Sequence, residues 1–303
     1  MYDLIIIGSG PAGLGAAIYA ERAKLNTITI EKDMMSGGQV LTTYEVDNYP
    51  GLPGISGFDL GMKLREHADK LGAKFVEDQV TAIGFDGDTK FVSGEEGFYE
   101  AKTIIIATGA KHKKLGVEGE ERLTGRGVAY CATCDGALYR DKDVAVVGGG
   151  DVAIEDAIFL ARFCRKVYLI HRRDELRGAK SLQDQLAKCE NVEILWNRVV
   201  EEIQGEDKVA QLKIKNLLQD QEETLEVQGI FVAVGITPNS EPFIGTIADE
   251  NGFLIAGENC VTDIPGIFAA GDVRTKDLRQ IITAVADGAN AVTSVEKYIM
   301  ETF

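Results

Sequence analysis

The chain has 303 residues, enough for two domains of about 100 to 200 residues each, and 45% of them are hydrophobic, as in a globular protein with a well-formed core. Its formal net charge of −16 disfavours nucleic acid and anionic membrane surfaces, because their phosphate groups would repel the protein. No apolar run is long enough to cross a membrane, and the chain starts on a core strand without a signal peptide, so we expect a cytoplasmic protein.

A glycine-rich turn stands near the N-terminus. Leu4–Ile7 predicts a strand, residues 8–13 a turn, and Pro11–Lys24 a helix. Glycines in this context let the backbone approach a pyrophosphate at the helix N-terminus. A second strand, Thr27–Ile30, leads to Glu31, about twenty residues after the first glycine, where a carboxylate binds ribose hydroxyls. The glycine pattern alone is weak evidence, but with its strand, helix and acid it predicts a dinucleotide site.

Cys131 and Cys134 form a C-x-x-C pair further along the chain. Such a pair could be half of a zinc site, which requires two further ligands with suitable spacing. The other cysteines and the three histidines form no such cluster, so we expect no metal. Two closely spaced thiols beside an acid suit a redox dithiol, in which one sulfur attacks a disulfide and the other resolves the mixed disulfide. Cys164 and Cys189 are expected to be inert and buried.

A second glycine-rich turn, residues 148–153, repeats the first. We expect a strand at Asp143–Val147, a helix from Asp151 to about Phe163 and a strand at Lys166–Ile170. The counterpart of Glu31 is His171, followed by Arg172, Arg173 and Arg177. A carboxylate would repel a 2′-phosphate, whereas guanidinium groups bind one, so this half predicts an NADP(H) site. The alternative is a solvated basic helix start.

The halves also match beyond these turns. Each half ends in an apolar segment that we expect to be a buried strand terminated by a glycine, at residues 103–109 and 229–235. A third such segment, 266–272, precedes a helix pattern from about Arg279 to Ile299 and has no partner repeat, so we expect it to complete the first domain. The predicted fold is α/β, with two Rossmann-like dinucleotide-binding domains, the second inserted into the first. The predicted boundaries are 1–113 and 241–303 for the first domain and 114–240 for the second.

Several short motifs occur along the chain in a distinctive order. They are Gly37-Gly38-Gln39 with Asn48-Tyr49-Pro50-Gly51, Ala107-Thr108-Gly109, Cys131-Ala132-Thr133-Cys134-Asp135, His171-Arg172-Arg173 with Arg177, Gly271-Asp272 and Arg279-Gln280. Over essentially its whole length the chain therefore resembles the low-molecular-weight, bacterial-type thioredoxin reductases, which are class II pyridine nucleotide-disulfide oxidoreductases. This resemblance implies a homodimer that reduces thioredoxin or a thioredoxin-like disulfide protein.

The resemblance also implies two cofactors. The first domain would bind FAD through Gly8, Gly10, Pro11, Ala12, Gly13, Glu31, Lys32, Gly38, Gln39, Asn48, Val80, Gly109, Gly271, Asp272, Arg279, Gln280 and Ile281. The second would bind NADPH through Gly150, Asp151, Val152, Ala153, Glu155, His171, Arg172, Arg173 and Arg177. A helix that begins near Arg279 would point its positive end at the reduced flavin. Asp151 departs from the Asn or Ser of other relatives, and its carboxylate would disfavour a pyrophosphate unless it caps its own helix.

The implied mechanism is a relay from NADPH through FAD to the dithiol and then to the partner. By family likeness, Cys134 faces the flavin, Cys131 attacks the partner, and Asp135 is the general acid that protonates a leaving thiolate. The alternative role of Asp135 is a helix N-cap or turn residue. Ala137-Leu138 stands where some relatives carry aromatics that grip thioredoxin, which leaves open another disulfide partner. A non-catalytic redox or NADPH sensor is the alternative from outside the enzymes.

Overall fold

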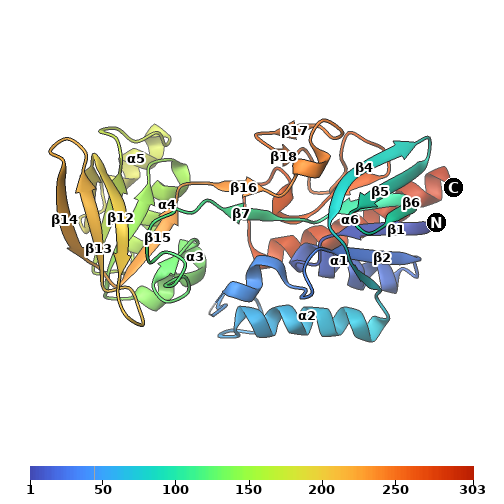
Figure 1. Ribbon diagram of the computed structural model, residues 1–303, viewed down its shortest axis with the longest axis horizontal. Coiled ribbons are helices and arrows are strands. Elements are labelled where there is room, and N and C mark those ends of the chain that lie inside the picture. The colour runs from blue at the N-terminus through green and yellow to red at the C-terminus, as the bar shows by residue number, and fades with distance from the viewer. Residues whose placement is uncertain (44) are drawn as a thin grey trace. The chain divides into compact units, whose positions relative to one another are not determined.

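The computed structural model describes residues 1–43 and 45–303, which form two compact units (Figure 1). The first unit comprises Met1–Thr43, Tyr49–Lys111 and Thr237–Phe303, and the second is built on His112–Ile236. The two segments that connect the units, β7 (Ala110–His112) and β16 (Ile236–Pro238), pair with each other as a two-stranded ribbon.

The first unit is built on a mixed sheet with the strand order β3-β2-β1-β6-β5-β4, and β19 pairs with β6. The strands are β1 (Tyr2–Ile7), β2 (Thr27–Glu31), β3 (Phe75–Glu77), β4 (Val80–Asp86), β5 (Thr89–Gly94), β6 (Phe98–Ile106) and β19 (Ile267–Ala269), and a short hairpin adds β17 (Asp249–Glu250) and β18 (Phe253–Leu254). The pairs of β1, β2, β3, β6 and β19 are parallel, and those of β4 with β5 and of β5 with β6 are antiparallel.

The apolar runs of β1 and β6 explain why this sheet lies in the core of the first unit. Ile5 and Ile7 belong to one buried cluster, and Leu4 and Ile6 belong to another. Because successive side chains of a strand point to opposite faces, these two clusters cover both faces of the sheet along β1. The helices of this unit are α1 (Pro11–Arg22), α2 (Gly57–Leu71) and α6 (Ile281–Thr302), with 3₁₀ turns η1 (Gly38–Thr42), η3 (Glu241–Phe243) and η4 (Gly271–Val273).

The second unit repeats the parallel arrangement. Its main sheet has the order β11-β10-β9-β15-β8, and an antiparallel sheet has the order β12-β13-β14. The strands are β8 (Val128–Ala129), β9 (Asp143–Gly148), β10 (Lys166–His171), β11 (Val192–Trp196), β12 (Arg198–Gln204), β13 (Gln211–Asn216), β14 (Gln221–Glu226) and β15 (Gly229–Ala233). The helices are α3 (Ala132–Asp135), α4 (Asp151–Ala161) and α5 (Lys180–Leu186), with the 3₁₀ turn η2 (Gly136–Tyr139).

The predicted α/β class is confirmed, and the third glycine-stopped segment returns to the first sheet, where β19 pairs with β6. Two helix boundaries differ from prediction. Helix α1 ends at Arg22 because Lys24 adopts φ +60°, and α6 begins at Ile281 because Gln280 and Thr283 form a capping box there. Within the described residues, no helix is both long and apolar enough to cross a membrane.

Candidate active site

The turn between β1 and α1 leaves open space at the helix N-terminus. Gly8 has φ +99°, and a Cβ there would lie 2.6 Å from the carbonyl oxygen of Ala107. A Cβ on Gly10, in contrast, would meet no atom within 4 Å. The N-terminus of α1 therefore borders a free volume of the kind in which helix ends bind anions.

Three other predicted FAD glycines belong to this first unit. A Cβ on Gly38, which has φ +61°, would lie 3.3 Å from the Cα of Gly10, and one on Gly271 would lie 2.8 Å from the Cβ of Ala12. A Cβ on Gly109 would meet no atom within 4 Å. The structure thus brings Gly10, Gly38 and Gly271 to one end of α1 from distant parts of the sequence. Asn48 is not among them, since it is grouped with the second unit.

Glu31 ends β2 beside the same turn. Its Oε2 accepts hydrogen bonds from the N–H of Ser9 at 2.7 Å and from the Ser9 hydroxyl at 2.8 Å. Its Oε1 accepts one from the N–H of Lys32 at 2.9 Å. The carboxylate therefore stands at the expected strand end and also holds the turn in place through Ser9. The sequence pattern did not reveal this second role. Its contact with a ribose stays a prediction.

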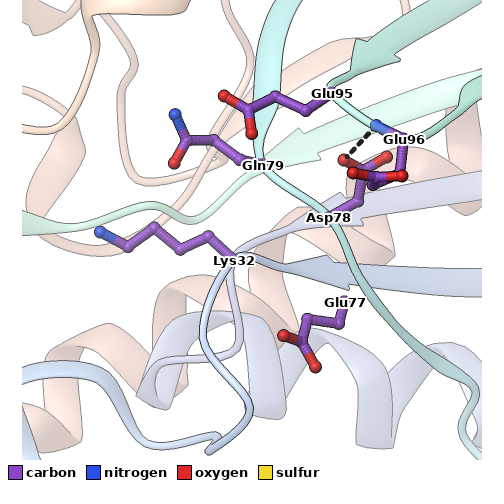
Figure 2. A pocket seen from close by; sticks show the side chains of 6 residues that line it. All are labelled: Lys32, Glu77, Asp78, Gln79, Glu95 and Glu96. Carbon is purple, nitrogen blue, oxygen red and sulfur yellow. Dashed lines mark hydrogen bonds between the residues drawn. The ribbon is translucent and has the colours of Figure 1, made fainter.

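A cavity of about 530 Å³ is lined in part by Lys32, the residue that follows Glu31 (Figure 2). Figure 2 shows Lys32 at the end of β2 on one side and the segment between β3 and β4 on the other. The lining residues are Lys32, Glu77, Asp78, Gln79, Glu95 and Glu96. Asp78 is buried and accepts hydrogen bonds from the N–H of Glu96 at 3.0 Å and the hydroxyl of Tyr99 at 2.9 Å. Lys32, a predicted FAD contact, lines the cavity, and Val80, another, follows the lining residue Gln79 in the chain.

Two predicted FAD residues before α6 have buried polar atoms without partners. Among the described residues, Oδ1 of Asp272 and Nε of Arg279 make no hydrogen bond although solvent does not reach them. Burial raises the pKa of the Asp272 carboxyl. Unsatisfied buried polar atoms are rare in native proteins, and a bound ligand is one common reason for them. This segment is therefore suited to a polar cofactor, with the capped N-terminus of α6 directly after it.

The turn between β9 and α4 has similar features. A Cβ on Gly150 would meet no atom within 4 Å, whereas one on Gly149 would clash with the imidazole of His171. His171 is only 5% exposed, and its Nε2 has no partner among the described residues. Burial lowers the pKa of this imidazole. The second turn therefore combines open space at a helix N-terminus with an unsatisfied polar atom, two features that the first unit shows at Gly10 and at Asp272.

The three predicted arginines follow β10. Arg172, Arg173 and Arg177 are exposed, and none forms an ion pair within the described part of the chain. The N–H of Arg177 donates to the carbonyl of Gly149 at 2.7 Å, which ties the arginine loop to the glycine turn. Asp151 does not cap its own helix, as the sequence had suggested it could. Its Oδ1 instead accepts the N–H of Ala179 at 2.6 Å, so the carboxylate is used to hold the start of α5.

The C-x-x-C pair forms a disulfide with the two Cα atoms 5.3 Å apart. Cys131 precedes α3, and its carbonyl accepts the N–H groups of Cys134 at 3.3 Å and Asp135 at 3.1 Å. Asp135 precedes η2, but its side chain makes no capping hydrogen bond there. Burial raises the pKa of its carboxyl to about 6. The short helix thus holds a closed disulfide beside an acid that can carry a proton near neutral pH.

The remaining cysteines are free thiols. Cys164 and Cys260 are buried, and burial raises their pKa values to about 11 and about 12. Cys189 is half-buried rather than buried as predicted, because it follows the end of α5, where less of the chain covers it. Among the residues that the structure describes, no three His, Cys, Asp or Glu side chains are placed to hold a metal ion.

Comparisons with known proteins agree with this geometry. A family model described as pyridine nucleotide-disulphide oxidoreductase matches residues 2–288. The chain belongs to this family. A thioredoxin reductase of Peptoclostridium acidaminophilum is 47% identical over 100% of this chain and 98% of the relative, and one of Bacillus subtilis (strain 168) is 44% identical over 99% and 96%. The crystal structure of thioredoxin reductase from Streptococcus pyogenes MGAS5005 has 48% identity, covers 99% of each chain and gives a TM-score of 0.95.

These relatives place the chain among the thioredoxin reductases of the family. Members are flavoproteins that contain FAD and use NADPH, so the predicted enzyme class and cofactors are confirmed. The thioredoxin reductase function is likewise confirmed at the level of the family. The residue assignments remain predictions, supported by the open glycine turns and the unsatisfied polar atoms described above.

Proposed function

We propose that the Cys131–Cys134 pair accepts electrons within the protein and reduces the disulfide of a thioredoxin. The observation that carries this proposal is a closed disulfide at a C-x-x-C pair, next to a buried carboxyl with a pKa of about 6. A dithiol that exchanges with a partner disulfide needs both a second sulfur to resolve the mixed disulfide and a proton source for the departing thiolate. The short segment from Cys131 to Asp135 supplies all three groups.

We propose residues 1–113 and 241–303 as the FAD domain and 114–240 as the NADPH domain. The residues predicted from the sequence keep their roles, because both turns have open space at a glycine, at Gly10 and Gly150. When bound, NADPH supplies two electrons and FAD passes them to the disulfide. Glycines and helix N-termini would hold the pyrophosphates, while Arg172, Arg173 and Arg177 would hold the 2′-phosphate by charge-assisted hydrogen bonds.

The exchange with the partner runs through the two sulfurs in turn. The Cys131 thiolate attacks one sulfur of the partner disulfide, which breaks that bond and releases a partner thiolate. The Cys134 thiolate then attacks the Cys131 sulfur, restores the Cys131–Cys134 disulfide and releases the second partner thiolate. Two electrons leave the protein in these steps. The carboxyl of Asp135 supplies a proton to a departing thiolate and regains it from solvent.

We further propose that the active species is a homodimer in the cytoplasm. The dimer is what the resemblance of the chain to the low-molecular-weight thioredoxin reductases implies. The cytoplasm is the compartment in which thioredoxin keeps thiols reduced. Sedimentation at concentrations across the micromolar range tests the dimer, and a mass equal to that of one chain throughout would contradict it.

An absorption spectrum and one steady-state assay test the proposed function. The purified protein should show a flavin spectrum that NADPH bleaches under anaerobic conditions. Continuous NADPH consumption should require thioredoxin together with a disulfide dye. If NADPH bleaches the flavin stoichiometrically but no disulfide protein supports turnover, the protein is a sensor instead. Turnover with a glutaredoxin-like protein but not with thioredoxin would identify a different partner.

A further inference from the structure

A buried cluster of charges lies in the first unit, behind the Gly271–Asp272 segment. Asp287 of α6 is only 4% exposed, and its carboxylate accepts two hydrogen bonds from Arg274, from Nη2 at 2.8 Å and Nε at 2.9 Å. Nζ of Lys276 donates to the same carboxylate at 2.9 Å. The side chains of Arg274 and Lys276 are 9% and 6% exposed. Two buried cations therefore share one buried carboxylate.

The same carboxylate holds the backbone of the predicted flavin segment. The N–H of Gly271 donates to Oδ2 of Asp287 at 2.9 Å. Gly271 has φ +79°, and a Cβ there would lie 2.8 Å from the Cβ of Ala12, so the turn is tightly packed against the start of α1. The next residue is Asp272, whose Oδ1 is buried and has no partner among the described residues. The position of that unsatisfied carboxylate consequently depends on a hydrogen bond to Asp287.

Charge is not balanced within this cluster. Burial raises the pKa of the Asp287 carboxyl, but the hydrogen bonds from Arg274 and Lys276 outweigh it and hold the pKa below its usual value, so Asp287 is ionised. Arg274 also donates to the carbonyls of Ala256 and Thr275, which are neutral acceptors. One positive charge thus remains in excess among these three side chains, and the two neighbouring groups that also act on them, Asp272 and Arg279, are of opposite sign. A charge in a protein interior acts with less screening than one at the surface.

We propose that Asp287 is a positioning residue for FAD and that the excess charge of Lys276 raises the reduction potential of the bound flavin. The proposal rests on the assignment of FAD to the first unit. Reduction adds negative charge to a flavin, and a nearby fixed cation stabilises the more negative form. Asp287 and Arg274 hold the turn at Gly271, while Lys276 supplies charge without a bond to that turn. Geometry and charge can therefore be separated by mutation.

The charge is tested by Lys276→Met in the FAD-loaded protein. This variant leaves the hydrogen bonds of Asp287 with Arg274 and Gly271 in place and removes one buried cation. The equilibrium constant for two-electron reduction of the flavin should fall on the order of tenfold, which corresponds to about 30 mV in midpoint potential. Lys297→Met on α6 is the control, because that lysine belongs to the same unit and is 74% exposed, and it should not shift the potential. A potential in Lys276→Met equal to that of the control would overturn the role of charge.

The positioning role is tested by Asp287→Asn, which adds one unit of net positive charge. The dissociation constant of FAD should rise at least about tenfold, since the turn loses its charged acceptor. In the fraction of Asp287→Asn that retains FAD, the midpoint potential of the flavin should rise, whereas it should fall in Lys276→Met. A merely structural role would not produce shifts in opposite directions. If Asp287→Asn does not fold, Arg274→Gln provides the same FAD titration. If a folded variant binds FAD as tightly as the unchanged protein does, the positioning role is refuted. If the unchanged protein itself binds no flavin, the proposed function is refuted instead.

Discussion

The two units share one strand–turn–helix–strand plan but differ where the second strand ends. In the first unit β2 ends at Glu31, which accepts hydrogen bonds from Ser9 in the glycine turn. In the second unit β10 ends at His171, whose imidazole lies against Gly149 of the turn, and exposed arginines follow. An acid suits ribose hydroxyls, and arginines suit a 2′-phosphate. The comparison shows how one plan serves two nucleotides through a few residues at one strand end.

A second difference is that only the second unit contains the dithiol. Cys131 directly precedes α3 and Cys134 lies on it, shortly before β9, so the redox group belongs to the unit that we assign to NADPH rather than to the one that we assign to FAD. If the units divide the work in this way, changes at the dithiol should spare both cofactor sites. Changes at either strand end should in turn spare the dithiol.

Replacement of either dithiol cysteine should have the largest effect. Cys131→Ser and Cys134→Ser should each abolish thioredoxin reduction, because a single thiol cannot complete the exchange. Flavin binding and bleaching by NADPH should be unchanged in both variants. Cys189→Ser, which removes a half-buried free thiol of the same unit, is the control and should retain full turnover.

The order of the two sulfurs can be decided by trapping. Cys134→Ser should form a stable mixed disulfide through Cys131 with a thioredoxin that lacks its resolving cysteine. Mass spectrometry of the trapped complex identifies the bond. A complex formed through Cys134 in Cys131→Ser, without the converse complex, would reverse the assignment.

Asp135→Asn should slow the exchange with thioredoxin about 100-fold, since it removes the proton donor. The donor function requires the protonated carboxyl, and the pKa of Asp135 is raised to about 6, so this contribution is present below pH 6 and is lost as the pH rises through it. Rapid-mixing rates of the thiol–disulfide step across pH 5 to 8, from about one unit below the pKa to about two units above it, measure this. An inflection near pH 6 that persists in Asp135→Asn would assign it to another group.

The double variant Arg172→Ala with Arg173→Ala tests the strand-end comparison directly. A hydrogen bond to a charged group contributes about 1.5 to 3 kcal/mol, so kcat/KM for NADPH should fall about ten- to a hundredfold. NADH turnover should hardly change because it lacks the 2′-phosphate. Lys188→Ala with Lys208→Ala removes two exposed positive charges from the same unit and serves as the control. Equal losses with NADPH and NADH would refute the assignment.

Much of this architecture is predictable because it follows from repeated local patterns. The apolar runs before each glycine turn predicted β1 and β9, and the unpaired third segment predicted the return of β19 to the first sheet. Helix ends were less predictable. Lys24 and Gln280 set them through a left-handed backbone and a capping box, which depend on single residues rather than on periodicity.

The site was only partly predictable for a similar reason. Spacing identifies Glu31 and the arginines, but it cannot show that Glu31 also binds Ser9 or that Asp151 holds Ala179. The Asp287 cluster escaped prediction because its members are about ten residues apart and meet only through the fold. An acid on the buried face of α6, among small residues, was the one sequence signal that could have indicated it.

Asp156 should give the smallest effect, on stability rather than on activity. It lies on α4 of the second unit, and burial, aided by repulsion from Glu155, raises the pKa of its carboxyl to about 7. The folded protein therefore binds a proton more tightly than the unfolded chain does. The free energy of unfolding accordingly falls as the pH rises from the ordinary value near 4 to about 7 and is flat above it.

Asp156→Asn removes this penalty, so it should stabilise the protein by about 1 to 3 kcal/mol at pH 8, with a smaller gain at pH 5. Thermal unfolding at the two pH values measures the difference, with exposed Asp207→Asn as the control. If Asp156→Asn raised the free energy of unfolding by the same amount at both pH values, the ionised carboxyl would not be the source of the gain. The corresponding residue of α1 is Ala16, 140 positions earlier in the repeat, which has no ionisable group, so this prediction also separates the two nucleotide units.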